Sequence, residues 1–241
     1  RIFLVTYDGN FYISNSIKEI KDKKLFFKKI KVNDNPIKLH SDDDMNYRNI
    51  KIRDILIHND FIFIVSNNSH YDSKSEEYFA SFKILKGKIN MEANSIIISN
   101  FFTTEEKYLD AKNDIDWSHT GGRIIHYKND NYIFSSSEFY LKPHELLVEK
   151  VTSNNSIAGK TFLINEKEIK LFSKGHRNIQ GIFYDKKNDL IFSSEHGPSG
   201  GDEINLIKKG KDYGWPRSSY GTIGYDGPKI PRKHEKFGYQ E

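Results

Sequence analysis

The residues best suited to chemistry in this 241-residue chain lie in a glycine-rich stretch, SSEHGPSGGDE (residues 193–203). It follows the apolar run DLIFSS, which is typical of a strand, and it combines glycines and a proline with a histidine and several carboxylates. Backbone carbonyls exposed by glycine, together with a few carboxylates, are the ligands that hard cations such as Ca²⁺ prefer. The stretch therefore indicates a cation-binding loop, although its spacing does not fit an EF-hand. The alternative is a flexible acidic loop without a ligand.

Two further clusters stand at the start of expected strands. In SHTGGR (118–123), His119 is expected at the mouth of a strand, where an imidazole can accept a proton near neutral pH. In GHRNIQG (175–181), Arg177 and Asn178 place a permanently charged planar donor beside an amide, a pair suited to binding carboxylates and carbonyls. The alternatives are structural: a histidine that completes a turn, an arginine that bridges to a neighbouring element, and an asparagine that caps a turn.

A fourth cluster, DYGWPRSSYG (212–221), carries Tyr213 and Trp215, which are expected to pack and to seat the glycine-rich loop. The histidines show no zinc-helix spacing such as HExxH, and the chain has no Walker loop, no Rossmann fingerprint and no nucleophile elbow. Nucleotide-dependent chemistry, α/β-hydrolase chemistry and a histidine-rich zinc site therefore find no support in the sequence.

Composition limits the class of protein. Hydrophobic residues make up 37% of the chain, charged residues 29% and aromatic residues 14%, which is typical of a folded globular protein. The net charge of +4 arises from scattered lysines rather than from a dense basic block, so no nucleic-acid partner is expected. The absence of cysteine excludes disulfides and thiolate metal sites. The longest apolar runs, such as FIFIV (61–65), are too short to span a bilayer.

Repeated hairpins must position these clusters. Each is an apolar strand, a polar turn and a second apolar strand that ends in small hydroxyl residues; the turns are at 58–60, 128–131 and 185–189. They recur roughly every 60 to 70 residues, which favours a β-propeller of four-stranded antiparallel blades over a sandwich. At that period the chain holds about three to four blades. We therefore expect an all-β fold in which residues 1–241 form a single β-propeller domain, a partial ring truncated at both ends.

Three other segments complete the expected secondary structure. Residues 3–14 alternate around Asp8 and Gly9, a strong hairpin signal. Residues 105–116 are the best helical candidate. The lysine-rich stretch 17–38 is compatible with an outer pair of strands or with an exposed loop.

Taken together and in order, the clusters resemble a known family. HTGGR, NSIAGK (155–160), GHRNIQG, EHGPSGGDEINLI, DYGWP and SYG are similar to the motifs of the pyrroloquinoline quinone (PQQ)-dependent soluble sugar dehydrogenases, also called the glucose/sorbosone dehydrogenase family. The resemblance covers residues 117–221 and implies a six-bladed β-propeller with PQQ and calcium as cofactors. It also implies oxidation of an aldose sugar or related alcohol, an external electron acceptor, and a periplasmic or secreted location.

The resemblance implies roles for residues around the cofactor. His119 matches the general base that takes the proton from the sugar's anomeric hydroxyl while hydride passes to PQQ. Arg177 and Asn178 match residues that contact PQQ, and the arginine charge would stabilise the oxygen of the reduced quinone.

The resemblance also implies two calcium sites. Gly197 and Pro198 match positions whose backbone carbonyls hold the catalytic calcium, which acts as a Lewis acid on the quinone. Glu203 and the carbonyl of Tyr213 match ligands of a second, structural calcium. The glycine-rich stretch is then a calcium platform.

The chain departs from the family pattern in two places. Ser118 stands where the best-known member of the family has an acidic residue before its histidine, and the family's early glutamine has no clear counterpart around 50–54. These departures leave open a non-catalytic, calcium-binding β-propeller that serves as an interaction domain. A third interpretation, a metal-dependent propeller hydrolase such as a lactonase, would require several carboxylates converging on the ring axis, which the motifs do not supply.

Overall fold

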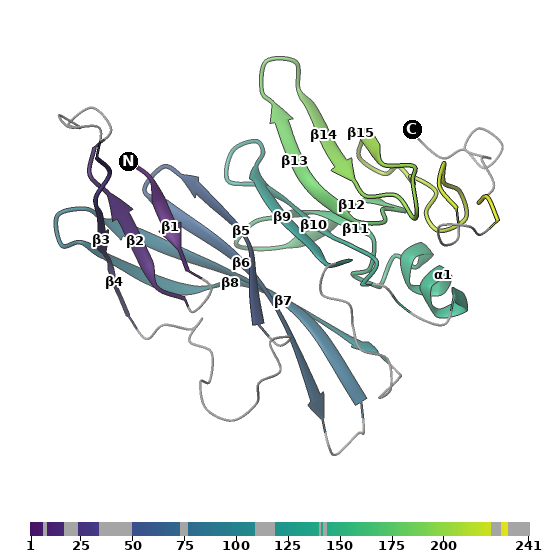
Figure 1. Cartoon of the computed structure of the whole chain (residues 1–241), viewed down its shortest axis with the longest axis horizontal. Coiled ribbons are helices and arrows are strands. Elements are labelled where there is room, and N and C mark those ends of the chain that lie inside the picture. Colours follow the sequence, from purple (N-terminus) through teal and green to yellow (C-terminus); the bar gives the residue numbers. More distant parts are fainter. Residues whose placement is uncertain are drawn as a thin grey trace.

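The computed structural model describes residues 1–6, 9–16, 24–33, 50–72, 77–108, 119–139, 141, 144–222 and 228–230. Within these residues the chain is mostly β-strand, arranged in four sheets. Figure 1 shows the sheets following one another in chain order, from the purple sheet near the N-terminus to the green sheet near the C-terminus. The predicted all-β fold is therefore confirmed, and the sheets are blades of a partial β-propeller.

The strands of each sheet are consecutive in the chain. The first sheet has the order β1-β2-β3, with β1 at Phe3–Val5, β2 at Phe11–Ser14 and β3 at Phe27–Lys29. The second has the order β4-β8-β7-β6-β5, with β4 at Lys31–Val32, β5 at Ile50–His58, β6 at Phe61–Asp72, β7 at Glu77–Asn90 and β8 at Ser95–Tyr108. The third has the order β12-β11-β10-β9, with β9 at Gly121–His126, β10 at Tyr132–Ser136, β11 at Lys160–Ile164 and β12 at Ile169–Lys174. The fourth has the order β13-β14-β15, with β13 at Ile179–Asp185, β14 at Leu190–Glu195 and β15 at Glu203–Ile207.

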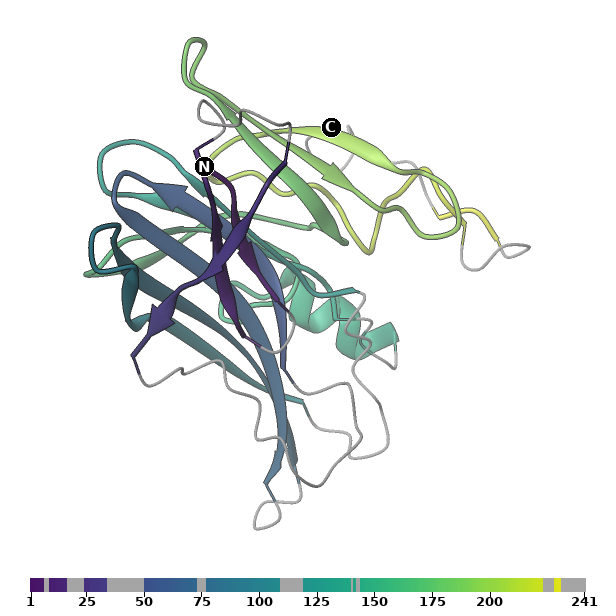
Figure 2. The same cartoon turned by 60° about the vertical axis from the view of Figure 1, so that its left-hand side comes forward.

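Strand β9 of the third sheet contacts the sheets on either side of it. Strand β9 contacts both β5 and β13, so these three strands lie next to one another from blade to blade. The third sheet is a four-stranded antiparallel blade as predicted. The second has a fifth strand, because β4 adds in parallel to the edge of β8. The strands of this second sheet also extend well past the neighbouring sheets (Figures 1 and 2).

The three hairpin turns predicted at 58–60, 128–131 and 185–189 are confirmed by the antiparallel pairs β5–β6, β9–β10 and β13–β14. Each turn has one short polar residue at positive φ: Asn59 at 53°, Asn129 at 54° and Asp189 at 57°. Asparagine and aspartate tolerate this left-handed region better than other residues with a side chain, which explains the Asn/Asp-rich turns. The hairpin around Gly9 also forms, from β1 and β2, while Asp8 lies outside the described residues.

The prediction of a helix over 105–116 is wrong for residues 105–108, the part of this segment that the structure describes. Residues 105–108 continue β8 and pair with 78–81 of β7, because a partner strand is available along the whole ladder; 109–116 lie outside the described residues. The lysine-rich stretch contributes β3 and β4, and its remaining residues are not described except for 24–26, 30 and 33. Helix α1 at His144–Thr152 was not predicted. Among the described residues, no helix is both long and apolar enough to cross a membrane.

Apolar side chains on both faces of the strands pack the blades together. Along β6, Ile62 and Ile64 pack with the first sheet, whereas Phe63 and Val65 pack with the third. All four are completely buried. Because alternate residues of a strand point to opposite faces, the continuous run FIFIV fills two interfaces at once.

A buried lysine holds α1 against the third sheet. Lys160 is fully buried, and its Nζ donates hydrogen bonds to the carbonyl oxygens of Lys150 (3.2 Å), Val151 (2.6 Å) and Ala158 (2.5 Å). Two of these carbonyls belong to the last turn of α1, where carbonyls lack partners within the helix and partial negative charge collects. The ammonium therefore neutralises and satisfies the end of the helix.

We expect Lys160→Met to lower the free energy of unfolding by about 3 kcal/mol, because the buried carbonyls lose a charged donor. Urea denaturation followed by circular dichroism measures the change. Lys170→Met is the control, since this half-exposed lysine lies on the neighbouring strand β12 and should change stability by less than about 0.5 kcal/mol. Equal stability of the Lys160→Met variant and the unmodified protein would contradict the role of the ammonium.

Candidate active site

The predicted site residues meet at one end of the blades. His119 lies just before β9, Arg177 and Asn178 lie just before β13, and Gly197 follows β14. Strand β9 contacts β13, and β14 pairs antiparallel with β13, so the starts of β9 and β13 lie at the same end as the finish of β14. The topology thus gathers three sequence clusters that are distant in the chain.

Two glycines allow the close approach of strands beside His119. Gly121 and Gly122 have φ of +68° and +87°, which favours glycine at both positions. A β-carbon on Gly121 would lie 2.7 Å from Ser137 Oγ, and one on Gly122 would lie 2.8 Å from the β-carbon of Arg53. The predicted close backbone approach at HTGGR is therefore present.

A buried carboxylate, Glu138, connects the histidine to the arginine. Its side chain is 2% exposed, and its Oε1 lies 3.3 Å from His119 Nδ1 and 3.3 Å from Arg177 Nε. Its Oε2 accepts a hydrogen bond from Trp215 Nε1 at 2.7 Å. A carboxylate at Nδ1 favours the imidazole tautomer that is protonated there, and the proton acceptor of that tautomer is Nε2.

Sequence analysis missed Glu138. The only signal was an acidic residue two positions after the apolar strand YIFSS, at the same end of the blade as HTGGR. Trp215 was expected to pack, and it does so against both partners: its indole bonds Glu138, and its ring lies 5.4 Å from the guanidinium carbon of Arg177. A cation over an indole face is a favourable arrangement.

Arg177 also reaches the glycine-rich loop. Its Nη1 donates hydrogen bonds to the carbonyl oxygens of His196 (3.0 Å) and Gly197 (2.8 Å), and its Nη2 lies 3.4 Å from His119 Nδ1. The carbonyl of Gly197 therefore already faces a positive charge. Asn178, the next residue, is 2% exposed, and its Oδ1 accepts hydrogen bonds from the side chains of Ser137 (2.9 Å) and Gln180 (2.7 Å).

Carbonyl oxygens crowd the interior of the loop. A β-carbon on Gly197 would lie 2.2 Å from the carbonyl oxygen of Gly200 and 2.3 Å from that of Gly201. One on Gly221 would lie 2.4 Å from the oxygen of Gly200 and 2.6 Å from that of Pro198. No side chain fits at either position, and neutral oxygen donors line the space. This donor set fits a hard cation such as calcium.

A small hollow of about 10 Å³ lies among the predicted metal ligands. Its lining includes Arg177 and all four residues predicted to bind calcium: Gly197, Pro198, Glu203 and Tyr213. The Tyr213 phenol is engaged elsewhere, because its hydroxyl donates to the Leu206 carbonyl at 2.6 Å. Burial raises the pKa of Tyr213 to about 12, so the phenol remains neutral.

A second buried carboxylate, Glu195, holds the segment that carries His176 and Arg177. Glu195 Oε1 lies 2.8 Å from Nδ1 of the fully buried His176, and Glu195 Oε2 accepts a hydrogen bond from the backbone N–H of Arg177 at 3.2 Å. Ser193 and Asn205 also donate to Oε1. Burial by itself would raise the pKa of Glu195, but the interactions with His176, Asn205 and Ser193 outweigh it and hold the pKa below its ordinary value.

Four sheets built mainly of antiparallel strand pairs, with a histidine–arginine–carboxylate cluster at one end, define the class of protein: a β-propeller with a polar site where its blades meet. Solved structures share this fold, two aldose sugar dehydrogenases among them. The apo-form of the soluble aldose sugar dehydrogenase of Escherichia coli has a TM-score of 0.65 at 19% identity. The PQQ-bound form of an aldose sugar dehydrogenase from Streptomyces coelicolor has a TM-score of 0.62 at 16% identity. Each match covers 95% of this chain and 63% of the other.

Sequence comparison places the chain within this class. Residues 53–241 match the Glucose / Sorbosone dehydrogenase family, and the chain belongs to that family. An aldose sugar dehydrogenase of Escherichia coli K12 is 35% identical over 124 residues, a stretch that covers 47% of this chain and 33% of the relative. The chain thus spans less than two thirds of the proteins that it matches.

We expect Glu195→Gln to lower the free energy of unfolding by about 2 kcal/mol at pH 7, since the buried hydrogen bonds lose their charged acceptor. Because the folded-state pKa of Glu195 lies below the ordinary 4.5, its contribution is fully present above pH 4.5 and is lost as the pH falls through the folded-state value. Denaturant titrations from pH 7 to about pH 3 should therefore show the two proteins converging in stability at the acid end. A difference that stays constant with pH would contradict this assignment.

Proposed function

We propose that the protein is a PQQ- and calcium-dependent dehydrogenase that oxidises an aldose sugar or a related alcohol and passes the electrons to an external acceptor. The observation that carries the proposal is the connected cluster of His119, Glu138, Arg177 and the Gly197 carbonyl at one end of the blades. Family membership and the E. coli relative, an aldose sugar dehydrogenase, support the class of reaction. The PQQ-bound Streptomyces structure supports the cofactor.

His119 is the proposed general base. Glu138 beside Nδ1 orients the imidazole, so that Nε2 can accept the proton of the substrate hydroxyl as the carbon loses hydride. The substrate then becomes a carbonyl compound, and the base holds its proton. When bound, PQQ supplies the hydride acceptor, and calcium polarises the quinone.

Arg177 is the proposed electrostatic partner of the cofactor. Glu138 and Trp215 fix its guanidinium within 3.4 Å of His119, so its charge is oriented before any ligand binds. Asn178, the next residue, is the proposed polar contact beside it. Such preorganised charge stabilises negative charge on oxygen without a cost of reorientation.

The loop residues are the proposed calcium ligands. The carbonyls of Gly197 and Pro198 would hold the catalytic calcium, and Glu203 with the carbonyl of Tyr213 would hold a structural one. The carbonyl-lined interior of the loop supports this assignment. We further propose that the blades belong to one propeller domain and that the protein works in the periplasm or outside the cell; the second point rests on the family resemblance.

We expect His119→Ala to reduce dye-linked sugar oxidation by about 10³-fold or more while PQQ affinity changes by less than about threefold. The assay follows reduction of an artificial acceptor with a panel of aldoses. His144→Ala is the control, because this exposed histidine lies at the start of α1. Unchanged turnover in His119→Ala would remove this residue from the mechanism.

We expect PQQ to bind stoichiometrically in the presence of calcium and weakly once calcium is chelated. Arg177→Ala should weaken binding by about 10- to 100-fold, whereas Arg217→Ala, at an exposed arginine nearby, should not. Absorbance titration measures both, on protein that carries all the blades of its structural relatives. If folded protein of that length binds no PQQ, the interaction-domain alternative is favoured instead.

A further inference from the structure

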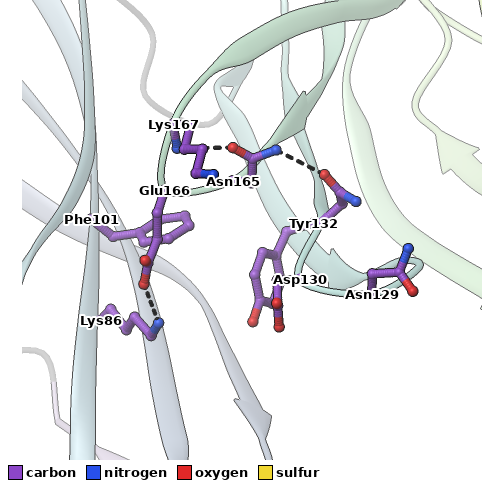
Figure 3. A pocket seen from close by; sticks show the side chains of 9 residues that line it. Lys86, Phe101, Asn129, Asp130, Tyr132, Asn165, Glu166 and Lys167 are labelled. Atoms are coloured by element: carbon purple, nitrogen blue, oxygen red, sulfur yellow. Dashed lines mark hydrogen bonds and ion pairs between the residues drawn. The ribbon is translucent and has the colours of Figure 1, made fainter.

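A cavity of about 440 Å³ lies between the second and third sheets, in a region that the proposed function does not use. Its walls come from β7, β8, the β9–β10 turn and the β11–β12 turn (Figure 3). Its size is within the range of small-molecule sites. His119 precedes the start of β9, whereas this turn follows its end, so the cavity lies roughly 20 Å from the candidate active site.

A tyrosine hydroxyl faces this cavity. Tyr132 is only 5% exposed, and its ring packs at 4.4 Å from that of Phe63 and at 5.8 Å from that of Phe101. Its hydroxyl makes none of the hydrogen bonds found among the described residues and is open to the solvent of the cavity. Burial and the carboxylates of Asp130 and Glu166 raise the pKa of Tyr132 to about 12, so the hydroxyl remains a hydrogen-bond donor.

The charges in the lining balance. Glu166 Oε1 pairs with Lys86 Nζ at 2.6 Å, and this interaction lowers the pKa of Glu166. Asp130 and Lys167 contribute one further charge of each sign. Asp130 forms no hydrogen bond or ion pair with the described residues, so its carboxylate can accept hydrogen bonds from a ligand. The two carboxylates would repel an anionic ligand, and the two ammonium groups would repel a cationic one. The lining therefore favours a neutral ligand.

The walls of the cavity are held in place before any ligand binds. Asn165 Nδ2 donates to Asn131 Oδ1 at 3.0 Å, joining the β11–β12 turn to the β9–β10 turn. Lys86 Nζ lies 4.4 Å from the ring centre of Phe61, which fixes the ion pair against the second sheet. Figure 3 shows the Phe101 ring and the Tyr132 ring on the cavity wall with the carboxylates of Asp130 and Glu166. Such fixed walls reduce the ordering cost of binding.

We propose that this cavity is a non-catalytic carbohydrate site that binds a neutral saccharide ring. Aromatic surface from the partly exposed Phe101 suits a C–H face of a sugar, and the Tyr132 hydroxyl, the Asp130 carboxylate and the amides suit its hydroxyl groups. The site would retain saccharide chains or sugar-rich surfaces at the end of the blades opposite the candidate active site. This inference does not depend on the proposed dehydrogenase activity.

The probes are methyl glycosides of glucose, galactose, mannose and xylose, measured by saturation-transfer NMR on cofactor-free protein. A methyl glycoside lacks the free anomeric hydroxyl that the proposed reaction oxidises, so binding is tested apart from turnover. We expect at least one glycoside to bind with a Kd of about 1 to 10 mM. Tyr132→Phe, which keeps the ring, and Asp130→Ala, in an exposed turn, should each weaken binding by about tenfold.

Two control variants locate the binding. Tyr184→Phe removes a tyrosine hydroxyl that bonds Asp189 in the neighbouring hairpin, and it should leave affinity unchanged. His119→Ala should also leave it unchanged. Absence of binding up to about 100 mM of every glycoside would overturn the proposal. So would binding that is lost in His119→Ala, or binding that survives both Tyr132→Phe and Asp130→Ala.

Discussion

Burial of both faces of each blade is the constraint on which the structure depends. Strand β6 packs Ile62 and Ile64 against one neighbour and Phe63 and Val65 against the other, and all four side chains are completely buried. A sheet that is apolar on both faces must have a sheet on each side. This stacking brings β5, β9 and β13 together, so loops far apart in the chain meet at one end.

At that end, a buried negative charge organises the site. Isolating a carboxylate from water costs several kcal/mol, so Glu138 is stable only with partners around it. His119, Arg177 and Trp215 supply them, and each comes from a different loop. The same carboxylate therefore orients an imidazole and fixes a guanidinium, which are the two groups that the proposed reaction needs. A second buried carboxylate, Glu195, holds the backbone of Arg177 from the other side.

The two ends of the third blade differ in chemistry for a physical reason. One end has glycine-rich loops, where backbone carbonyls approach one another and a cation can bind. The other end has tight Asn/Asp turns whose side chains project toward the neighbouring blade and leave a cavity with balanced charge. Strand connectivity separates the two regions, because a hairpin places its turn at the end opposite its termini.

The sequence by itself determined the features that depend on residues close together in the chain. Asn/Asp turns, the doubly buried run FIFIV and the glycine-rich loop depend on neighbouring residues, and their motifs pointed to the propeller and to His119, Arg177 and the carbonyl loop. Only the tertiary structure decided which residues far apart in the chain come into contact. Glu138 and Trp215 bond across 77 positions of the chain, and residues 105–108 form strand because β7 offers them a partner. No pattern in the chain reports such pairings, because they follow from how blades stack rather than from the residues beside them.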